Sequence, residues 1–303
     1  MPGDATARFA ASSVGAALAE AITLPIDCTK VRLQVQKAVP PGSAAAQSPH
    51  HYTGMFDALL KIGRTEGLAG LCKGMFPAQV RQVSYSSITL VLYEPIRNAI
   101  AGQNVDASQI PFWKRLLSAG TAGGIGIAIM NPTEVIKTQM QANTERLTMA
   151  GVARNVYSAG GLAGFWAGVQ PNVARTFLVN AAELGTYDQA KNMLINDYGM
   201  KEGAVAHVSA SGIAGFTSAT VSTPVDVVKT RLMAQAGQGA KEYSGMVEAL
   251  FHPSRSILAK EGVSALYKGF TPIFWRKIIW CSVFFVSYEK LRAAIGNEDV
   301  EEQ

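Results

Sequence analysis

The sequence predicts an all-α membrane protein in which three repeats of roughly a hundred residues together form one transport domain. Only 16% of the 303 residues are charged and 48% are hydrophobic, which disfavours a pair of ordinary soluble domains. Apolar stretches with at most one charge occur at 9–24, 83–93, 116–130, 176–182, 208–221 and 278–286. Extended across their flanks, these stretches approach the ~20 residues that a bilayer requires. We therefore expect six transmembrane helices, several of them with charged ends that face an aqueous interior.

The first helix of each repeat ends on one motif: a proline, an acid two residues later and a lysine three residues after that. The copies are Pro25-Asp27-Lys30, Pro132-Glu134-Lys137 and Pro224-Asp226-Lys229. A proline kinks a helix, and ionisable residues at the end of an apolar helix need partners or water. A solvated helix end would explain any single copy. Three copies at matching offsets instead indicate that the charges face one another.

The helices that precede this motif carry a small residue at every fourth position. These stripes are Ala11-Gly15-Ala19, Ser118-Ala122-Gly126 and Ala210-Ala214-Ser218. Small residues at this spacing allow membrane helices to pack closely. An alanine-rich soluble core is the alternative explanation, but it does not account for the same stripe before the same charged motif three times.

The second half of each repeat keeps its own register. A glycine stands three residues before a proline, an arginine follows that proline by four residues, and a tyrosine follows the glycine by 19 residues. The arginines are Arg81, Arg175 and Arg276, and the tyrosines are Tyr93, Tyr187 and Tyr288. This spacing divides the chain into repeats 1–105, 106–199 and 200–303.

A shorter amphipathic segment lies between the paired helices of each repeat, at 52–67, near 151–161 and at 243–262. We expect these segments to form helices that lie along the membrane surface. The stretch 38–51 is rich in Pro, Ala and Ser and predicts a loop, and the acidic tail 298–303 predicts disorder.

These motifs resemble those of the mitochondrial carriers, and the resemblance covers almost the whole chain. The runs 9–34, 92–97 and 171–188 are most similar to the uncoupling proteins and to their dicarboxylate and oxoglutarate carrier relatives. The resemblance implies a multi-pass transporter of the mitochondrial inner membrane that acts as a monomer. It also implies a six-helix barrel with threefold pseudosymmetry that opens alternately to the two sides.

The resemblance further implies a ring of ion pairs that closes the matrix side. It pairs Asp27 with Lys137, Glu134 with Lys229, and Asp226 with Lys30. Gln34 and Gln141 would brace these pairs by hydrogen bonding, whereas Met233 takes the equivalent place in the third repeat, so fewer than three braces are expected. The second repeat departs as well, because Gln139 stands where the others have Arg32 and Arg231.

A second ring would close the cytoplasmic side in the same way. Its acids follow the three tyrosines directly and its bases follow three residues later: Glu94 with Arg97, Asp188 with Lys191, and Glu289 with Arg292. Tyr93, Tyr187 and Tyr288 would brace these pairs. Both rings cannot be closed while a substrate passes, and a passive channel would not need two opposing rings.

The substrate site implied by the resemblance lies between the rings. It combines Arg81 with Gln82, Arg175 with Thr176, and Arg276 with Lys277, together with the acids Glu20 and Glu183. The planar fork of arginine suits carboxylate or phosphate oxygens, so we expect a small anion of the dicarboxylate type. Glu20 and Glu183 would either couple transport to protons or neutralise a neighbouring arginine. Alternatively, Arg276 and Lys277 lie at the membrane interface.

An uncoupling-type proton leak protein, regulated by fatty acids and nucleotides, is the other function that the resemblance allows. Uncoupling proteins typically carry a further cavity arginine and an apolar residue where this chain has Thr89 and Lys277. These two differences argue against inhibition by purine nucleotides. The chain shows no metal or cofactor motif and no nucleophile elbow, which argues against an enzyme, and its charge of +5 is too diffuse for nucleic acid binding.

Inner-membrane lipid is the remaining partner that the resemblance implies. Glycines at the starts of helices would offer backbone amides to the phosphates of cardiolipin. These glycines are Gly54, Gly74, Gly151, Gly168, Gly245 and Gly269. The second repeat matches this pattern least well at Gly151.

Overall fold

The computed structural model describes residues 2–36, 48, 50–102, 110–145, 147–199, 204–236 and 261–301. Within these ranges the secondary structure is helical and includes no strand. The expected loop at 38–51 and the surface helix at 243–262 lie largely outside them. The acidic tail is expected to be disordered from 298, but residues 298–301 continue the last helix, Phe270–Glu301, so this prediction is wrong for them. The all-helical fold class expected from the sequence is therefore confirmed for the described residues.

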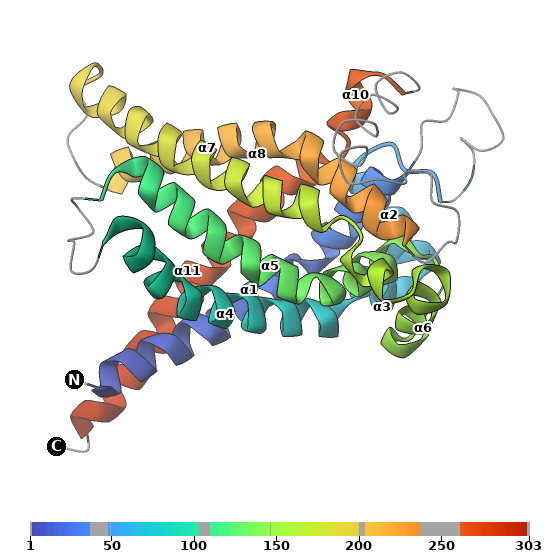
Figure 1. Ribbon diagram of the computed structural model, residues 1–303, viewed down its shortest axis with the longest axis horizontal. Coiled ribbons are helices and arrows are strands. Elements are labelled where there is room, and N and C mark those ends of the chain that lie inside the picture. Colours follow the sequence, from blue (N-terminus) through green and yellow to red (C-terminus); the bar gives the residue numbers. More distant parts are fainter. Residues whose placement is uncertain are drawn as a thin grey trace.

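Six helices longer than 25 residues make up most of the described chain (Figure 1). They are α1 (Pro2–Val35), α4 (Met75–Ala101), α5 (Phe112–Ala142), α7 (Val169–Asn196), α8 (Ala204–Gln235) and α11 (Phe270–Glu301). Each helix contacts the next in the order α1, α4, α5, α7, α8, α11, and α11 returns to α1, so the helices form a closed ring. Each repeat contributes two consecutive members of this ring.

The ring narrows at one end, because α1, α5 and α8 also contact one another directly. Pro25, Pro132 and Pro224 lie inside these three helices. Beyond each proline the helix carries the acid and lysine of the repeated motif. We call this part of the bundle, where the C-terminal segments of α1, α5 and α8 meet, the closed end.

Short helices gather around the closed end, away from the two chain termini (Figure 1). They are α2 (Met55–Thr65), α3 (Gly67–Leu71), α6 (Met149–Gly160), the 3-10 helix η2 (Leu162–Trp166) and α10 (Val263–Leu266). The helix α2 is amphipathic, since the apolar Ala58 and Ile62 are buried while the polar Arg64 and Thr65 are exposed. The buried face packs on Leu33 of α1 and attaches the short helix to the bundle.

A left-handed glycine starts the second long helix of each repeat. Gly74, Gly168 and Gly269 have φ angles of +78°, +70° and +84°, a conformation that L-residues with a side chain rarely adopt. A Cβ atom on Gly269 would lie 3.0 Å from Cγ of Gln34, and one on Gly168 would lie 3.1 Å from Cγ of Met233. Glycine is therefore required both by the turn and by the close approach of the next repeat.

By length and composition alone, one described stretch, Val263–Tyr288, is apolar enough to cross a membrane. The other long helices are less apolar by this measure, and some of them carry charges that are buried within the bundle. In α1, for example, Glu20, Asp27 and Arg32 are all buried. A measure based on composition counts such residues against a span even where they face the interior of the protein.

Candidate functional site

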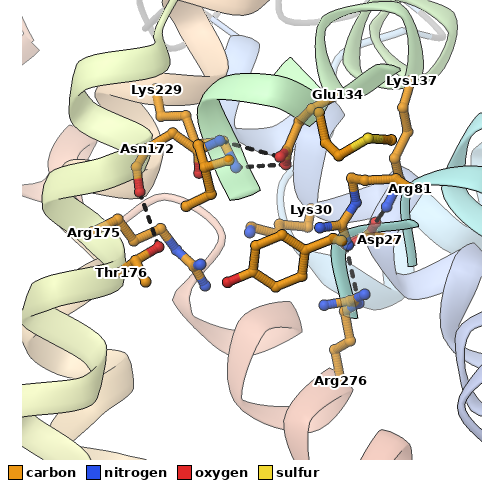
Figure 2. A pocket seen from close by; sticks show the side chains of 13 residues that line it. Asp27, Lys30, Arg81, Glu134, Lys137, Asn172, Arg175, Thr176, Lys229 and Arg276 are labelled. Carbon is orange, nitrogen blue, oxygen red and sulfur yellow. Dashed lines mark hydrogen bonds and ion pairs between the residues drawn. The ribbon is translucent and has the colours of Figure 1, made fainter. Parts of the chain in front are cut away.

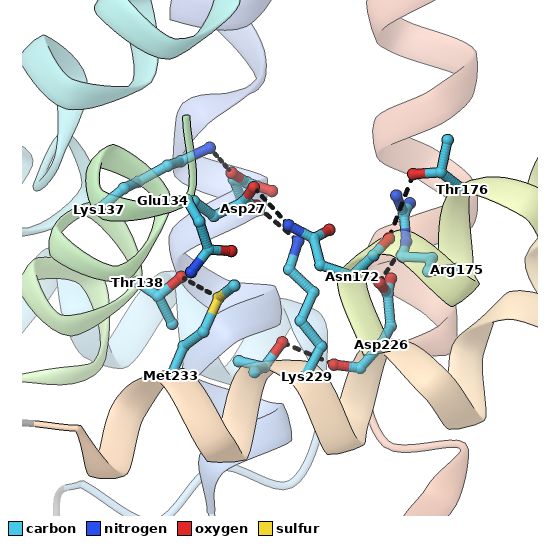
Figure 3. A network of polar contacts seen from close by, with 12 residues as sticks. Asp27, Glu134, Lys137, Thr138, Asn172, Arg175, Thr176, Asp226, Lys229 and Met233 are labelled. Atoms are coloured by element: carbon cyan, nitrogen blue, oxygen red, sulfur yellow. Dashed lines mark hydrogen bonds and ion pairs between the residues drawn. The ribbon is translucent and has the colours of Figure 1, made fainter. Parts of the chain in front are cut away.

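Three ion pairs link the three repeats at the closed end, and Figure 3 shows two of them, Asp27 with Lys137 and Glu134 with Lys229. Nζ of Lys137 lies 2.5 Å from Oδ2 of Asp27, Nζ of Lys229 lies 2.6 Å from Oε1 of Glu134, and Nζ of Lys30 lies 2.9 Å from Oδ2 of Asp226. Asp27, Asp226 and Lys137 are all buried. Each acid thus lies beside the lysine of the repeat that the resemblance assigned to it. We call these six residues the ring.

Glu20 lies about two helical turns before Asp27 in α1 and also contacts the ring. One of its carboxylate oxygens lies 3.1 Å from Nζ of Lys137, and the other accepts a hydrogen bond of 2.8 Å from Arg276. With 1% of its surface exposed, Glu20 is enclosed by these two cations. This arrangement matches a role in charge neutralisation, one of the two roles considered for this residue.

The two glutamines do not hydrogen-bond the ring pairs in the described structure. Oε1 of Gln34 accepts from Oγ1 of Thr230 at 2.7 Å, and the side-chain amide of Gln141 is buried without a partner. In the second repeat, Oγ1 of Thr138 approaches Sδ of Met233 at 3.8 Å. The first repeat has Val31 at the position of these threonines. Because valine has no hydroxyl group, it offers Gln141 no hydrogen bond.

A polar cavity with a volume of about 140 Å³ lies directly against the ring (Figure 2). Side chains from all three repeats line it: Asp27, Lys30, Arg81, Tyr85, Ile127, Met130, Glu134, Lys137, Asn172, Arg175, Thr176, Lys229 and Arg276. Six of these side chains are cationic and two are acidic. Such an excess of positive charge in a partly enclosed space favours an anionic ligand.

The three cavity arginines differ in their partners. Arg276 lies 3.0 Å from Asp27, and Arg175 forms an ion pair with Asp226. Arg81, in contrast, forms no ion pair or hydrogen bond with any described residue, and its Nε atom is buried. Figure 2 shows all three side chains reaching toward the same space. The cavity therefore holds one guanidinium group that forms no direct ion pair with a described residue.

Asn172 explains why Arg81 lacks a partner. Its Nδ2 donates a hydrogen bond of 3.1 Å to Oε2 of Glu134, the third acid of the ring. Ala78 and Ile273 occupy the equivalent positions after the prolines of the other two repeats, and neither can donate such a bond. Asn172 thus donates a hydrogen bond to Glu134, whereas an arginine contacts the equivalent acids, Asp27 and Asp226, of the other two repeats. Asn172 and Tyr85 were not among the site residues expected from the sequence.

The other residues expected at the substrate site lie in two places. Thr176 lines the cavity, whereas Gln82 does not. Lys277 forms an ion pair with Glu183, which also accepts a hydrogen bond of 3.0 Å from Ser218. Glu183 follows Thr176 by two helical turns, which is a rise of ~10 Å. The site predicted from the sequence therefore combines residues that the structure separates into the cavity and the ion pair of Lys277 with Glu183.

The residues of the second expected ring are only partly described. Arg97 lies 3.9 Å from Glu94 on its own helix and also donates to Oδ1 of Asn98 at 3.0 Å. The ring of Tyr288 stacks on Phe284 with centroids 6.1 Å apart. The side chains of Asp188, Glu289 and Arg292 lie outside the described structure, so this ring stays a prediction.

The glycines expected to bind lipid occupy starts of helices where they are described. Gly54 caps α2, and Gly74 and Gly168 cap α4 and α7. The amide of Gly151 already donates to Oγ1 of Thr148 at 3.1 Å, which makes it a poor phosphate ligand. Gly245 lies outside the described residues.

The unpaired amide of Gln141 gives a stability prediction. The substitution Val31→Thr would supply the hydroxyl donor that Thr230 supplies to Gln34, and a buried hydrogen bond contributes ~1 kcal/mol. We expect a higher unfolding temperature in thermal denaturation of the purified protein in detergent. Val31→Ala is the control and should lower it, because it removes buried apolar surface. A Val31→Thr variant no more stable than the parent would show that Gln141 is satisfied in another way.

Comparisons with known proteins agree with this arrangement. The family model of the mitochondrial carrier protein matches three segments, 2–104, 108–198 and 201–299. The chain is 33% identical to mitochondrial uncoupling protein 1 of Arabidopsis thaliana, over 97% of this chain and 95% of that protein. It is 35% identical to mitochondrial uncoupling protein 3 of the same plant, over 95% and 94% of the two chains. It is 31% identical to the dicarboxylate carrier UCP2 of Danio rerio, over 97% and 94%. The chain therefore belongs to the mitochondrial carrier family, whose members are transporters and not enzymes.

Proposed function

We propose that this protein exchanges small dicarboxylate anions across the mitochondrial inner membrane by alternating access. The observation that carries this proposal is the cationic cavity, which is built by all three repeats, rests on the ring and contains one unpaired arginine. An anionic ligand would satisfy Arg81 without any rearrangement. An uncharged ligand would leave that guanidinium group without a direct ion pair and its buried Nε without a hydrogen-bond acceptor, which is costly.

In this proposal the six long helices span the membrane as a threefold barrel, and the protein works as a monomer. Large apolar side chains are exposed on several of them, including Ile22, Leu90, Ile129, Phe216 and Phe285. Exposed apolar side chains along helices that bury their charges are typical of a surface that faces lipid. The closed end would then lie on the matrix side, with the short helices at the membrane surface and cardiolipin at the starts of α4, α7 and α11.

The cavity arginines connect ligand binding to the ring. Arg175 and Arg276 contact Asp226 and Asp27, which are ring acids. A dicarboxylate would place one carboxylate on Arg81 and compete for Arg175 or Arg276 with the other. Each arginine drawn to the ligand leaves its ring acid with a weaker set of partners. A ligand with two anionic groups would thereby destabilise the closed end, whereas a monoanion would bind Arg81 alone.

The ring on the opposite side would close as the matrix side opens. It would use Glu94, Asp188 and Glu289 with Arg97, Lys191 and Arg292, braced by the three tyrosines. The present contact between Glu94 and Arg97 stays within one helix and leaves most of Glu94 exposed. This is the geometry expected of a ring in its open state.

A proton leak of the uncoupling type is the second candidate, because several similar proteins carry the name uncoupling protein. Thr89 bears on this choice. A Cβ atom on Gly126 would lie 2.9 Å from Oγ1 of Thr89, so this threonine faces α5 at close range. At this position the chain has threonine and no further cavity arginine, which favours anion exchange without control by nucleotides.

Transport by the purified protein in liposomes tests the proposal. We expect exchange of labelled malate or succinate against internal dicarboxylate, with little inhibition by GTP. Fatty-acid-dependent proton flux that GTP blocks, without any dicarboxylate exchange, would favour the second candidate and exclude the first. Transport of cations or neutral solutes alone would contradict both.

Arg81 should be the first contact of the anion. Arg81→Ala should raise the KM for dicarboxylate by about tenfold or more, since a charge-assisted hydrogen bond is worth ~1.5–3 kcal/mol. Arg81→Lys should keep the charge and recover part of the loss. Arg154→Ala, which removes an exposed arginine outside the cavity, is the matched control. Unchanged KM values in both Arg81 variants would remove Arg81 from the site.

The ring should depend on the pairing across repeats. The cleanest exchange is Glu134→Lys with Lys229→Glu, because this pair contacts no cavity arginine. Each single variant should abolish transport, since it places two like charges together at a buried position. The double variant should restore part of the activity. Absence of rescue in a folded double variant would argue against this ion pair as part of a gate.

Any proton coupling should depend on Glu183 rather than on the enclosed Glu20. Glu183→Gln mimics the protonated side chain and releases Lys277, so uptake should no longer respond to a pH gradient. Ser218→Ala, which removes one hydrogen bond from Glu183, should keep the response. Glu20→Gln should lower exchange at every pH, because it removes a counter-charge of Lys137 and Arg276. A normal pH response in Glu183→Gln would exclude this residue as the coupling group.

A further inference from the structure

A cluster of charged residues at the rim of the closed end joins the first repeat to the second. Arg32 donates to Oε2 of Glu66 at 2.8 Å, and Lys73 donates to the same oxygen at 2.6 Å. Both cations also cross to the second repeat. Nε of Arg32 donates to the carbonyl of Gln141 at 3.0 Å, and Nζ of Lys73 donates to the carbonyl of Asn143 at 2.9 Å. We call this set of an arginine, a glutamate and a lysine a clamp.

The third repeat carries the same clamp at the same offsets and joins it to the first repeat. Arg231 donates to Glu261 at 2.8 and 3.0 Å, and Lys268 lies 3.3 Å from Glu261. Nε of Arg231 donates to the carbonyl of Gln34 at 3.0 Å, and Nζ of Lys268 donates to that of Gln36 at 3.1 Å. At the rim of the closed end, outside the ring, two of the three junctions between repeats are thus held by charge-assisted hydrogen bonds among the described residues.

The second repeat has none of the three charged residues of the clamp. Gln139, Gly160 and Ala167 stand at the positions of the arginine, the glutamate and the lysine. Gln139 keeps one hydrogen bond to the third repeat, from its Nε2 to the carbonyl of Met233 at 3.2 Å. Around it the junction is apolar, with Met233 packed in a cluster formed by Val135, Ile136, Val152 and Val156.

Both clamps stay charged at neutral pH. Burial raises the pKa of Glu66, but hydrogen bonds from Arg32 and Lys73 outweigh it and bring that pKa below its ordinary value. Hydrogen bonds from Arg231, despite burial, lower the pKa of Glu261 to about 2. Because a lowered carboxyl pKa stabilises the folded state above its usual titration range, both clamps act fully at the pH of a cell compartment.

All three junctions keep a ring pair, and the junction of repeats 2 and 3 also has the ion pairs Arg175–Asp226 and Lys277–Glu183, so the difference in strength lies at the rim. Hydrogen bonds to charged groups are roughly twice as strong as neutral ones, and the junction of repeats 2 and 3 has only neutral ones at its rim among the described residues. The unpaired amide of Gln141 weakens the junction of repeats 1 and 2. That single defect is smaller than the combined contribution of the Arg32 and Lys73 contacts that cross the same junction.

We propose that the closed end opens first between repeats 2 and 3, while the two clamps keep repeats 1 and 2 and repeats 3 and 1 together. The bundle then opens asymmetrically despite its threefold pseudosymmetry. This proposal rests on the proposed function only in that a carrier must open this end. It concerns the junctions themselves, so it can be tested without knowledge of the substrate.

Three equivalent positions allow a direct comparison of the junctions. Val31, Thr138 and Thr230 share one offset in the three repeats and are similarly buried, at 6%, 6% and 5% exposure. Single cysteines are placed there in a chain whose Cys28, Cys72 and Cys281 are replaced by serine, reconstituted in lipid. The rate of reaction with a small water-soluble maleimide then reports opening at each junction. Thr138→Cys should react about tenfold faster than the others, the factor that one charge-assisted hydrogen bond represents.

Transfer of the clamp provides the second arm of the test. Gln139→Arg, Gly160→Glu and Ala167→Lys together should slow labelling at position 138 to the rate of the other two positions. Gly160 can accept a side chain, because a Cβ atom there would meet nothing within 4 Å. The reverse transfer, Arg231→Gln with Glu261→Gly and Lys268→Ala, should make position 230 react fast instead.

The outcomes separate this inference from the proposed function. Equal labelling at the three positions, or fastest labelling at position 31 or 230 in the parent chain, would overturn it. If the transferred clamp prevents folding, the reverse transfer decides, and a rate at position 230 that stays slow would also overturn it. Labelling in the expected order by a protein that fails to exchange dicarboxylates would uphold the unequal junctions and reject the substrate.

Discussion

The ring of ion pairs at the closed end is the interaction on which the rest of the structure depends. Asp27 and Asp226 of the ring are buried and Glu134 is half-buried, and a buried charge without a partner is strongly destabilising. The partner always comes from another repeat, so no repeat can complete its closed end alone. The prolines that turn the three helices inward, and the left-handed glycines that let the next repeat approach, follow from this requirement. The three repeats must therefore assemble as one unit.

Much of this arrangement could be predicted from residue spacing. A fixed offset along a helix sets both the height and the direction of a side chain, so three identical offsets predict three equivalent positions. The ring contacts and the position of Arg81, Arg175 and Arg276 beside them agree with that logic. The partner that a long side chain selects depends on its neighbours in space. For this reason the contact of Asn172 with Glu134, the unpaired Gln141 and the separation of Glu183 from the cavity could not be predicted.

The departures from threefold symmetry carry most of the information about function. A symmetric bundle would have three equivalent arginines and three equivalent junctions. Here Asn172 replaces an arginine as a hydrogen-bond partner of Glu134, and Arg81 is left without a direct ion pair. Gln139, Gly160 and Ala167 remove one clamp entirely. Each departure changes a charge or a hydrogen-bond donor at a position that the other two repeats define, so the repeats serve as internal controls for one another.

The ring acids also explain how the cavity can hold so much positive charge. Asp27 and Asp226 each contact both a ring lysine and a cavity arginine, so they act as counter-ions for the cavity. Under the proposed function, a bound dianion would take over part of this role and leave the acids with their lysines alone. Ligand and ring acids would then compete for the same two guanidinium groups, and the anion would lower the cost of separating the repeats. The shared use of Arg175 and Arg276 would thereby couple binding to opening.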